Sequence, residues 1–82
     1  MTFLPGDPSA PPRVAYAVGK RVGPAVVRNR VRRRLRGATL SHRAELQPGG
    51  AYLFGAAPAA AAAPFAEIEA AMGELLAVAD RS

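Results

Sequence analysis

The sequence predicts a single small α/β domain with two short strands and two helices. Three observations predict this class. The chain has two short runs of strand-forming residues, a long segment with helical apolar spacing between them, and an amphipathic C-terminal segment. The chain has 82 residues, enough for one domain over residues 1–82. Half of the residues are hydrophobic, but 19 of them are alanine. We therefore expect a core with few large side chains.

The first half of the pattern is an irregular segment followed by a strand. Residues 1–12 form a proline-rich N-terminal segment, and its part 5–12 (PGDPSAPP) is incompatible with a helix or a central strand. Over residues 13–18, Val14, Tyr16 and Val18 alternate with two alanines. This period of two predicts a strand with its larger side chains on one face.

A long helix follows after a short loop over residues 19–23. Pro24 suits the first position of a helix, and Gly23 is the expected cap. The helix is expected to end at about Leu46, because residues 47–50 read Gln-Pro-Gly-Gly, a strong turn signal.

The C-terminal part repeats the order of strand and helix. Residues 51–55 (AYLFG) predict a second strand, so that 13–55 forms a strand–helix–strand unit. An alanine-rich linker covers 56–63, and Pro64 opens a helix within 64–82 that runs to about Ala79. One apolar stripe is expected along that helix: Phe65, Ile68, Met72, Leu75, Leu76 and Ala79.

The first helix combines a narrow apolar stripe with a broad basic surface. Its stripe contains Val27, Val31, Leu35 and Ala38. Arg28 and Arg34 flank the stripe, and the far side carries Asn29, Arg30, Arg32, Arg33, Arg36 and Arg43. Gly37 lies within the helix at a cost of about 1 kcal/mol relative to alanine.

The charge is divided unevenly along the chain. Ten lysines and arginines and no acid lie from Arg13 to Arg43, whereas the part from residue 44 onward is acidic. Arginines repeat at helix spacings where each like-charge pair costs ~0.2–0.5 kcal/mol, and a merely solvated helix would intersperse glutamate. Nine of the ten are arginine, which suits phosphate recognition. The pattern predicts nucleic-acid binding and favours RNA, because no helix-turn-helix pair, zinc ligand set or dimerising heptad accompanies it.

The segment from Arg13 to Arg36, RVAYAVGKRVGPAVVRNRVRRRLR, closely resembles the signature region of the bacterial ribonuclease P protein subunit. In that family a strand leads into a basic dipeptide, a Val-Gly turn and a helix with an Arg-Asn-Arg motif. The corresponding residues are Lys20-Arg21, Val22-Gly23 and Arg28-Asn29-Arg30. The segments AYLFG and PFAEIEAAMGELL resemble the last strand and the C-terminal helix of the family.

The resemblance implies a fold like that of ribonuclease P proteins and of the second domain of ribosomal protein S5. This fold is an α+β sandwich whose two predicted strands are parallel and joined by the arginine helix in a left-handed crossover. The family's chains begin with a further helix and strand ahead of Thr2–Leu4, and we expect both to be absent here. Gly19 and Gly55 also stand where the family commonly has Ser and Arg.

The resemblance also implies an accessory role in the endoribonuclease that removes the 5′ leader from precursor tRNA. A catalytic RNA cleaves with bound Mg²⁺, so no catalytic residue, metal ligand or cofactor is expected in the protein, and no obligate protein partner. The residues implied to contact the catalytic RNA are Lys20, Arg21, Arg28, Asn29, Arg30, Arg32, Arg33, Arg34 and Arg36. Asn29 is expected to make hydrogen bonds that set the geometry of neighbouring arginines.

The 5′ leader is implied to lie in a cleft on the sheet, with Arg13 and Tyr16 as candidate contacts. A core position for Tyr16 is an equally good interpretation, since tyrosine is common in half-buried strands. Two other functions stay open: a general or ribosome-associated RNA-binding protein, and a basic amphipathic helix at an anionic membrane surface. Without cysteine, a signal peptide or a convincing membrane span, the chain is expected to be soluble and cytoplasmic.

Overall fold

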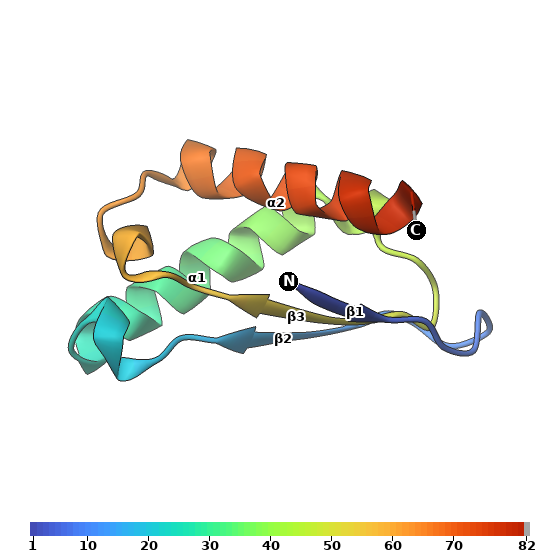
Figure 1. The fold of residues 1–82 in the computed structure, drawn as a ribbon, viewed down its shortest axis with the longest axis horizontal. Helices are drawn as coiled ribbons and strands as arrows, with labels where there is room; N and C mark the ends of the chain where they lie inside the picture. The colour runs from blue at the N-terminus through green and yellow to red at the C-terminus, as the bar shows by residue number, and fades with distance from the viewer. Residues whose placement is uncertain (82) are drawn as a thin grey trace.

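The computed structural model describes residues 1–81 and shows a three-stranded sheet with two long helices on one face (Figure 1). The strands are β1 (Thr2–Leu4), β2 (Arg13–Ala17) and β3 (Ala51–Gly55). The long helices are α1 (Ala25–Ser41) and α2 (Phe65–Arg81), and the 3₁₀ turns are η1 (Lys20–Val22), η2 (Arg43–Glu45) and η3 (Pro58–Ala61). The strand–helix–strand–helix order predicted from the sequence is confirmed.

The central strand of the sheet is β3. The order is β1-β3-β2, with β2 parallel and β1 antiparallel to β3. Val14 lies opposite Tyr52 in the parallel pair, and Phe3 lies opposite Tyr52 in the antiparallel pair. The parallel arrangement of the two predicted strands is thus confirmed, and α1 forms the crossover that it requires. The sequence did not indicate β1, because three residues are too few to show an alternation.

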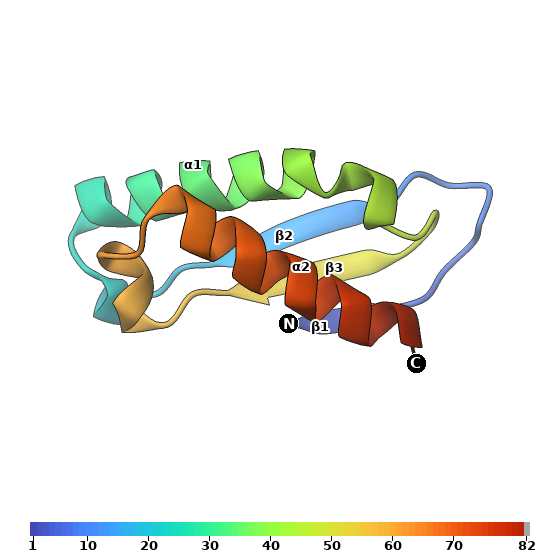
Figure 2. The same cartoon turned by 90° about the horizontal axis from the view of Figure 1, so that it is seen from above.

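The two faces of the sheet differ completely. Both helices cover one face, and no element within residues 1–81 covers the other (Figures 1 and 2). Strand alternation therefore sends Tyr52 and Phe54 into the core and leaves Leu53 exposed on the open face. Leu4 of β1 is also exposed. Strand β2 contributes Arg13 and two alanines to the open face.

The core lies between the sheet and the two helices. Its buried side chains are Val18, Val22, Val31, Leu35, Ala38, Tyr52, Phe54, Ile68, Met72 and Leu76. The predicted stripe of α1 is buried except at its first residue, Val27, which is half-buried. In α2, the predicted stripe is buried at four positions, but Phe65 and Leu75 stay 40% and 41% exposed. The stripe of α2 is therefore narrower than its sequence suggested.

Aromatic side chains connect the three strands on the covered face. The ring centroids of Phe3 and Tyr52 are 4.8 Å apart, and the Phe54 centroid lies 6.3 Å from those of both Tyr52 and Tyr16. The Tyr52 hydroxyl accepts a hydrogen bond of 2.8 Å from the backbone N–H of Gln47. These contacts give an alanine-rich chain much of its large apolar packing.

Helix α1 is shorter than predicted at both ends. Pro24 caps it in an extended conformation (ψ 168°), so the expected cap at Gly23 lies one residue too early. The helix ends at Ser41 and a separate 3₁₀ turn follows. Hydroxyl groups in its last turns bond back to the helix backbone, Thr39 to the Leu35 carbonyl and Ser41 to the Gly37 carbonyl. Such bonds weaken a helix locally, and the sequence pattern had missed this end.

The predicted turn over residues 47–50 is confirmed, with a 3.0 Å bond from Gly50 N–H to the Gln47 carbonyl. Gly49 has φ 74°, a conformation that glycine adopts without strain. A β-carbon there would also collide with the backbone of Asp7. The turn thus sits directly against the proline-rich segment that leads into β2.

Candidate nucleic-acid interface

The apolar stripe of α1 determines where its arginines lie. Because Val31, Leu35 and Ala38 pack into the core, the opposite surface of the helix faces solvent. Arg33 and Arg36 are exposed on that surface, and Arg28, Arg30, Arg32 and Arg34 are half-buried beside the stripe. The predicted division of α1 into a packed and a basic surface is confirmed. Arg30 and Arg32, expected on the far side, lie beside the stripe instead, and Arg43 lies in η2 beyond the end of the helix.

Two arginines on one side of α1 are tied to the segment that precedes α2. Arg30 Nη2 donates to the Ala61 carbonyl at 3.1 Å, and Arg34 Nη1 donates to the Ala63 carbonyl at 2.8 Å. These bonds fix each guanidinium at one edge and leave the other terminal nitrogen of each to bind elsewhere. The Arg30 Nε is itself buried without an acceptor.

On the other side of α1, Asn29 and Arg32 form a local pair. Arg32 Nη1 donates to Asn29 Oδ1 at 3.1 Å, and Arg32 Nη2 lies 3.5 Å from the Val18 carbonyl just after β2. The role expected for Asn29, holding a neighbouring arginine in position, agrees with this contact. Arg28 lies near the same end of the helix, with its Nε buried and without an acceptor.

The basic dipeptide extends the charged surface beyond the helix. Lys20 and Arg21 are exposed in η1, which directly precedes the N-terminal end of α1 (Figure 1). The residues singled out for RNA contact thus lie together on α1 and the turn before it. We call this set the basic surface: Lys20, Arg21, Arg28, Asn29, Arg30, Arg32, Arg33, Arg34 and Arg36.

The positive charge of the basic surface is not neutralised by the acidic side chains of residues 1–79. Within residues 1–79, one ion pair is present, between His42 Nδ1 and Glu45 Oε2 at 2.9 Å, beyond the C-terminal end of α1. No carboxylate of this part of the chain pairs with an arginine of α1. Concentrated like charge held on a rigid helix attracts a polyanion and repels itself in its absence.

The two candidate leader contacts point to opposite faces of the sheet. Arg13 is exposed on the open face at the start of β2. Tyr16 lies on the covered face, where its hydroxyl is 2.7 Å from Thr39 Oγ1 and its ring stacks near Phe54. The structure therefore favours the packing interpretation of Tyr16, and it does not bring the two residues together.

His42 has a structural position between the helices. Its Nε2 lies 2.8 Å from the Glu69 carbonyl of α2, while its Nδ1 faces Glu45. Among the described residues, no three histidine, aspartate or glutamate side chains gather closely enough to hold a metal ion. Nor does any described helix have the length and apolar character needed to cross a membrane.

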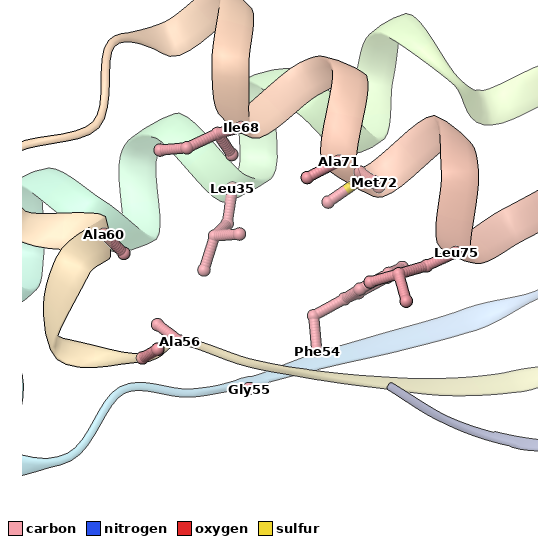
Figure 3. A pocket seen from close by; sticks show the side chains of 10 residues that line it. Leu35, Phe54, Gly55, Ala56, Ala60, Ile68, Ala71, Met72 and Leu75 are labelled. Carbon is pink, nitrogen blue, oxygen red and sulfur yellow. The ribbon is translucent and has the colours of Figure 1, made fainter.

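An apolar cavity lies away from the basic surface. It occupies about 150 Å³ between the end of β3, η3 and the two helices (Figure 3). Leu35, Phe54, Ile68 and Met72 line it together with several alanines. Ligand sites need a few polar groups to orient what they bind, and this lining has almost none. Four of its ten lining residues are alanine, and these short side chains leave the space unfilled.

Sequence reasoning missed one component next to the basic surface. A surface pocket of about 370 Å³ is lined by Arg30, Arg33, Arg34 and Phe65, although Phe65 was assigned to the apolar stripe of α2. The signal was Gly37, an unfavourable residue within a helix. A β-carbon at Gly37 would lie 3.1 Å from Phe65 Cε2, so the glycine makes room for the ring.

Comparison with known proteins places these features in a family. The family model described as "Ribonuclease P" matches residues 1–80. The ribonuclease P protein component of Beutenbergia cavernae is 53% identical over 64 residues, covering 77% of this chain and 53% of the relative. The corresponding component of Acidothermus cellulolyticus is 46% identical over 65 residues, covering 79% and 54%. The chain thus spans about half the length of these curated relatives.

A solved structure supports the fold independently. The RNase P protein of Staphylococcus aureus superposes with a TM-score of 0.76 at 21% sequence identity, covering 92% of this chain and 69% of that one. The mixed sheet with two helices is therefore the fold of an RNase P protein, as the sequence predicted. With a family model that matches nearly the whole chain, similar relatives and a shared fold, this chain belongs to the ribonuclease P protein component family.

Proposed function

We propose that this chain is the RNA-binding subunit of a ribonuclease P that assists a catalytic RNA in removing the 5′ leader from precursor tRNA. The observation that carries the proposal is the basic surface, whose guanidinium groups have no carboxylate partner among residues 1–79. Each arginine that neutralises a phosphate releases condensed counterions, which favours association of protein and RNA. The physical role of the protein is then to supply counter-charge, working in the cytoplasm without an obligate protein partner.

In this proposal the RNA performs the cleavage. The carboxylates of the described chain lie mainly on α2 and η2, and no three of them gather as ligands for a metal ion. Magnesium is a hard cation that takes oxygen ligands, which RNA phosphates provide. We therefore assign Mg²⁺ to the catalytic RNA, and the protein lowers the concentration needed by reducing phosphate repulsion.

We propose the open face of the sheet as the place for the 5′ leader. No element within residues 1–81 covers this face (Figure 1), and the exposed Leu4, Arg13 and Leu53 lie on it. A flexible single strand can contact apolar side chains with its bases and a guanidinium with its backbone. Tyr16 is not part of this surface, because its side chain lies on the covered face.

The structure argues against the membrane-surface alternative. An interfacial helix needs a large apolar face free to enter the lipid. The apolar side chains of α1 at Val31, Leu35 and Ala38 are instead buried against the rest of the molecule. A general RNA-binding protein would bind all RNAs alike, whereas the proposed subunit should prefer the catalytic RNA. The experiment below measures this preference.

The test is precursor-tRNA cleavage at low magnesium, with the catalytic RNA of a bacterium whose protein component is similar in sequence. We expect this chain to raise the rate of 5′ leader release, and the double variant Arg33→Gln/Arg36→Gln to raise it less. The matched control is Glu74→Gln, which changes a charge on α2 outside the basic surface. Binding to the catalytic RNA should also persist against an excess of bulk mature tRNA at moderate salt.

Two results would contradict the proposal. One is a cleavage rate that the wild-type chain leaves unchanged at every magnesium concentration. The other is equal competition by bulk tRNA, which identifies a general RNA-binding protein because contacts to phosphate alone ignore sequence and shape.

A further inference from the structure

We propose that Arg30, Arg33, Arg34 and Phe65 form a subsite for one unpaired nucleotide, whose base stacks on Phe65 and whose phosphate binds the arginines. This inference rests on the proposed function for the nature of its ligand, an RNA. It goes beyond that function by naming an aromatic platform at the start of α2 and by requiring an unstacked base.

The position of Phe65 is the first observation. Its side chain is 40% exposed, although it is one of only three phenylalanines in a chain poor in large apolar residues. Aromatic rings pack in the pairs Phe3–Tyr52, Tyr16–Phe54 and Tyr52–Phe54, and Phe65 belongs to none of these pairs. Burial in the core therefore does not explain an aromatic residue at this position.

The second observation is how α1 holds the ring. Gly37 lies in the interior of α1, and a β-carbon there would approach Phe65 Cε2 to 3.1 Å and Cζ to 3.5 Å. The glycine thus lets the edge of the ring rest against the helix backbone, beside the basic surface. A helix-interior glycine is unfavourable, so this contact compensates a real cost.

The third observation is the arrangement of charge around the ring. Arg30 and Arg34 are tethered through one edge to the carbonyls of Ala61 and Ala63. Arg33 lies between them in sequence, is exposed, and has no acid partner within residues 1–79. The pocket that these arginines share with Phe65 measures about 370 Å³, within the range of small-molecule ligand sites.

An aromatic ring next to several guanidinium groups matches the chemistry of a single nucleotide. Bases stack on aromatic side chains when the strand is unpaired, and arginine binds the attached phosphate through two parallel hydrogen bonds. Duplex RNA presents no free base face and would engage only the arginines. The subsite therefore predicts a preference for single-stranded over paired RNA beside α1.

The first test uses the fluorescence of the Phe65→Trp variant, because the chain contains no tryptophan. We expect octaadenylate to quench the emission of this single indole, and a paired RNA hairpin or inorganic polyphosphate to leave it nearly unchanged. Emission that does not respond to octaadenylate under conditions where the variant binds it would overturn the proposal.

The second test compares affinities for octaadenylate. Phe65→Leu should weaken binding by about 5- to 140-fold, the range that corresponds to loss of one stacked base, while Phe65→Tyr should retain it. Affinity for polyphosphate should stay the same in both variants. The control Leu40→Ala removes an exposed apolar side chain that lies on α1 outside the subsite, and it should change neither affinity. Equal affinities of Phe65→Leu and wild type for octaadenylate would contradict the subsite.

The two proposals fail separately in these experiments. If the chain binds the catalytic RNA and speeds cleavage but the indole emission of the Phe65→Trp variant is insensitive to octaadenylate, the subsite is wrong and the proposed function stands. If octaadenylate quenches the emission but the chain does not affect cleavage, the subsite stands and the ribonuclease P role is wrong. Circular dichroism of each variant confirms that the comparison is made on folded protein.

Discussion

Single residues in this chain do more than their type suggests. Gly37 accommodates an aromatic ring, Asn29 orients Arg32, and two backbone carbonyls hold Arg30 and Arg34. The contacts of Arg30, Arg32 and Arg34 decide which of their N–H groups remain free for a phosphate. The density of arginine alone says how much charge is present but not how it is oriented.

At this scale we predict a coupling between Gly37 and Phe65. Gly37→Ala should stabilise a helix by about 1 kcal/mol, but the new methyl group would press on the Phe65 ring. We therefore expect a clearly smaller gain in the wild-type background, and the full gain in the background Phe65→Ala. Urea unfolding of the four proteins measures both values as a double-mutant cycle. An equal gain in the two backgrounds would show that the ring does not constrain position 37.

At the scale of elements, the arginine helix and the two longer strands were predictable because their patterns are long and regular. The stripe of α1 indicated its packed face, and the alternation in β2 indicated which of its side chains share a face. Strand β1 was not predictable, since its pairing with β3 depends on partners far away in the sequence. The early end of α1 depends on hydroxyl groups that bond back to its own carbonyls, which apolar spacing does not reveal.

The candidate site was predictable to a similar extent. The charged residues of α1 were found from sequence, because their surface follows directly from the buried stripe. Phe65 and the anchoring carbonyls of Ala61 and Ala63 were not, because they belong to an alanine-rich linker and the helix that follows it. Tyr16 shows the opposite case, where a resemblance suggested a binding residue and its packing against Phe54 and Thr39 favours a core role.

The alanine-rich linker and its cavity lead to a prediction about the packing of elements. Ala60 lines the apolar cavity of about 150 Å³ between η3, β3 and the helices (Figure 3). Ala60→Leu should fill part of it and raise the free energy of unfolding by about 0.5–2 kcal/mol. Thermal or urea unfolding measures the change, and the exposed Ala59→Leu is the control. A loss of stability with Ala60→Leu would mean that the cavity cannot accept the larger side chain without strain.

The whole molecule has one face of the sheet covered by two helices of opposite charge and one face left open. Both helices lie on one face of the sheet, with α1 carrying the basic surface and α2 most of the glutamates (Figures 1 and 2). The opposite face is open and carries a few apolar side chains and Arg13. A domain of this size with so much alanine has little packing energy to spare. Its concentration of arginine on one helix therefore indicates a selected function, because it destabilises the free protein.

The most direct test of the central claim is the salt dependence of binding to the ribonuclease P catalytic RNA. If Arg33 and Arg36 each contact a phosphate, Arg33→Gln/Arg36→Gln should lower the slope of log affinity against log salt by about 1.4 to 1.8. The charge-conserving Arg33→Lys/Arg36→Lys should keep the wild-type slope. A glutamine variant whose slope equals that of wild type would show that the exposed arginines of α1 do not contact the RNA.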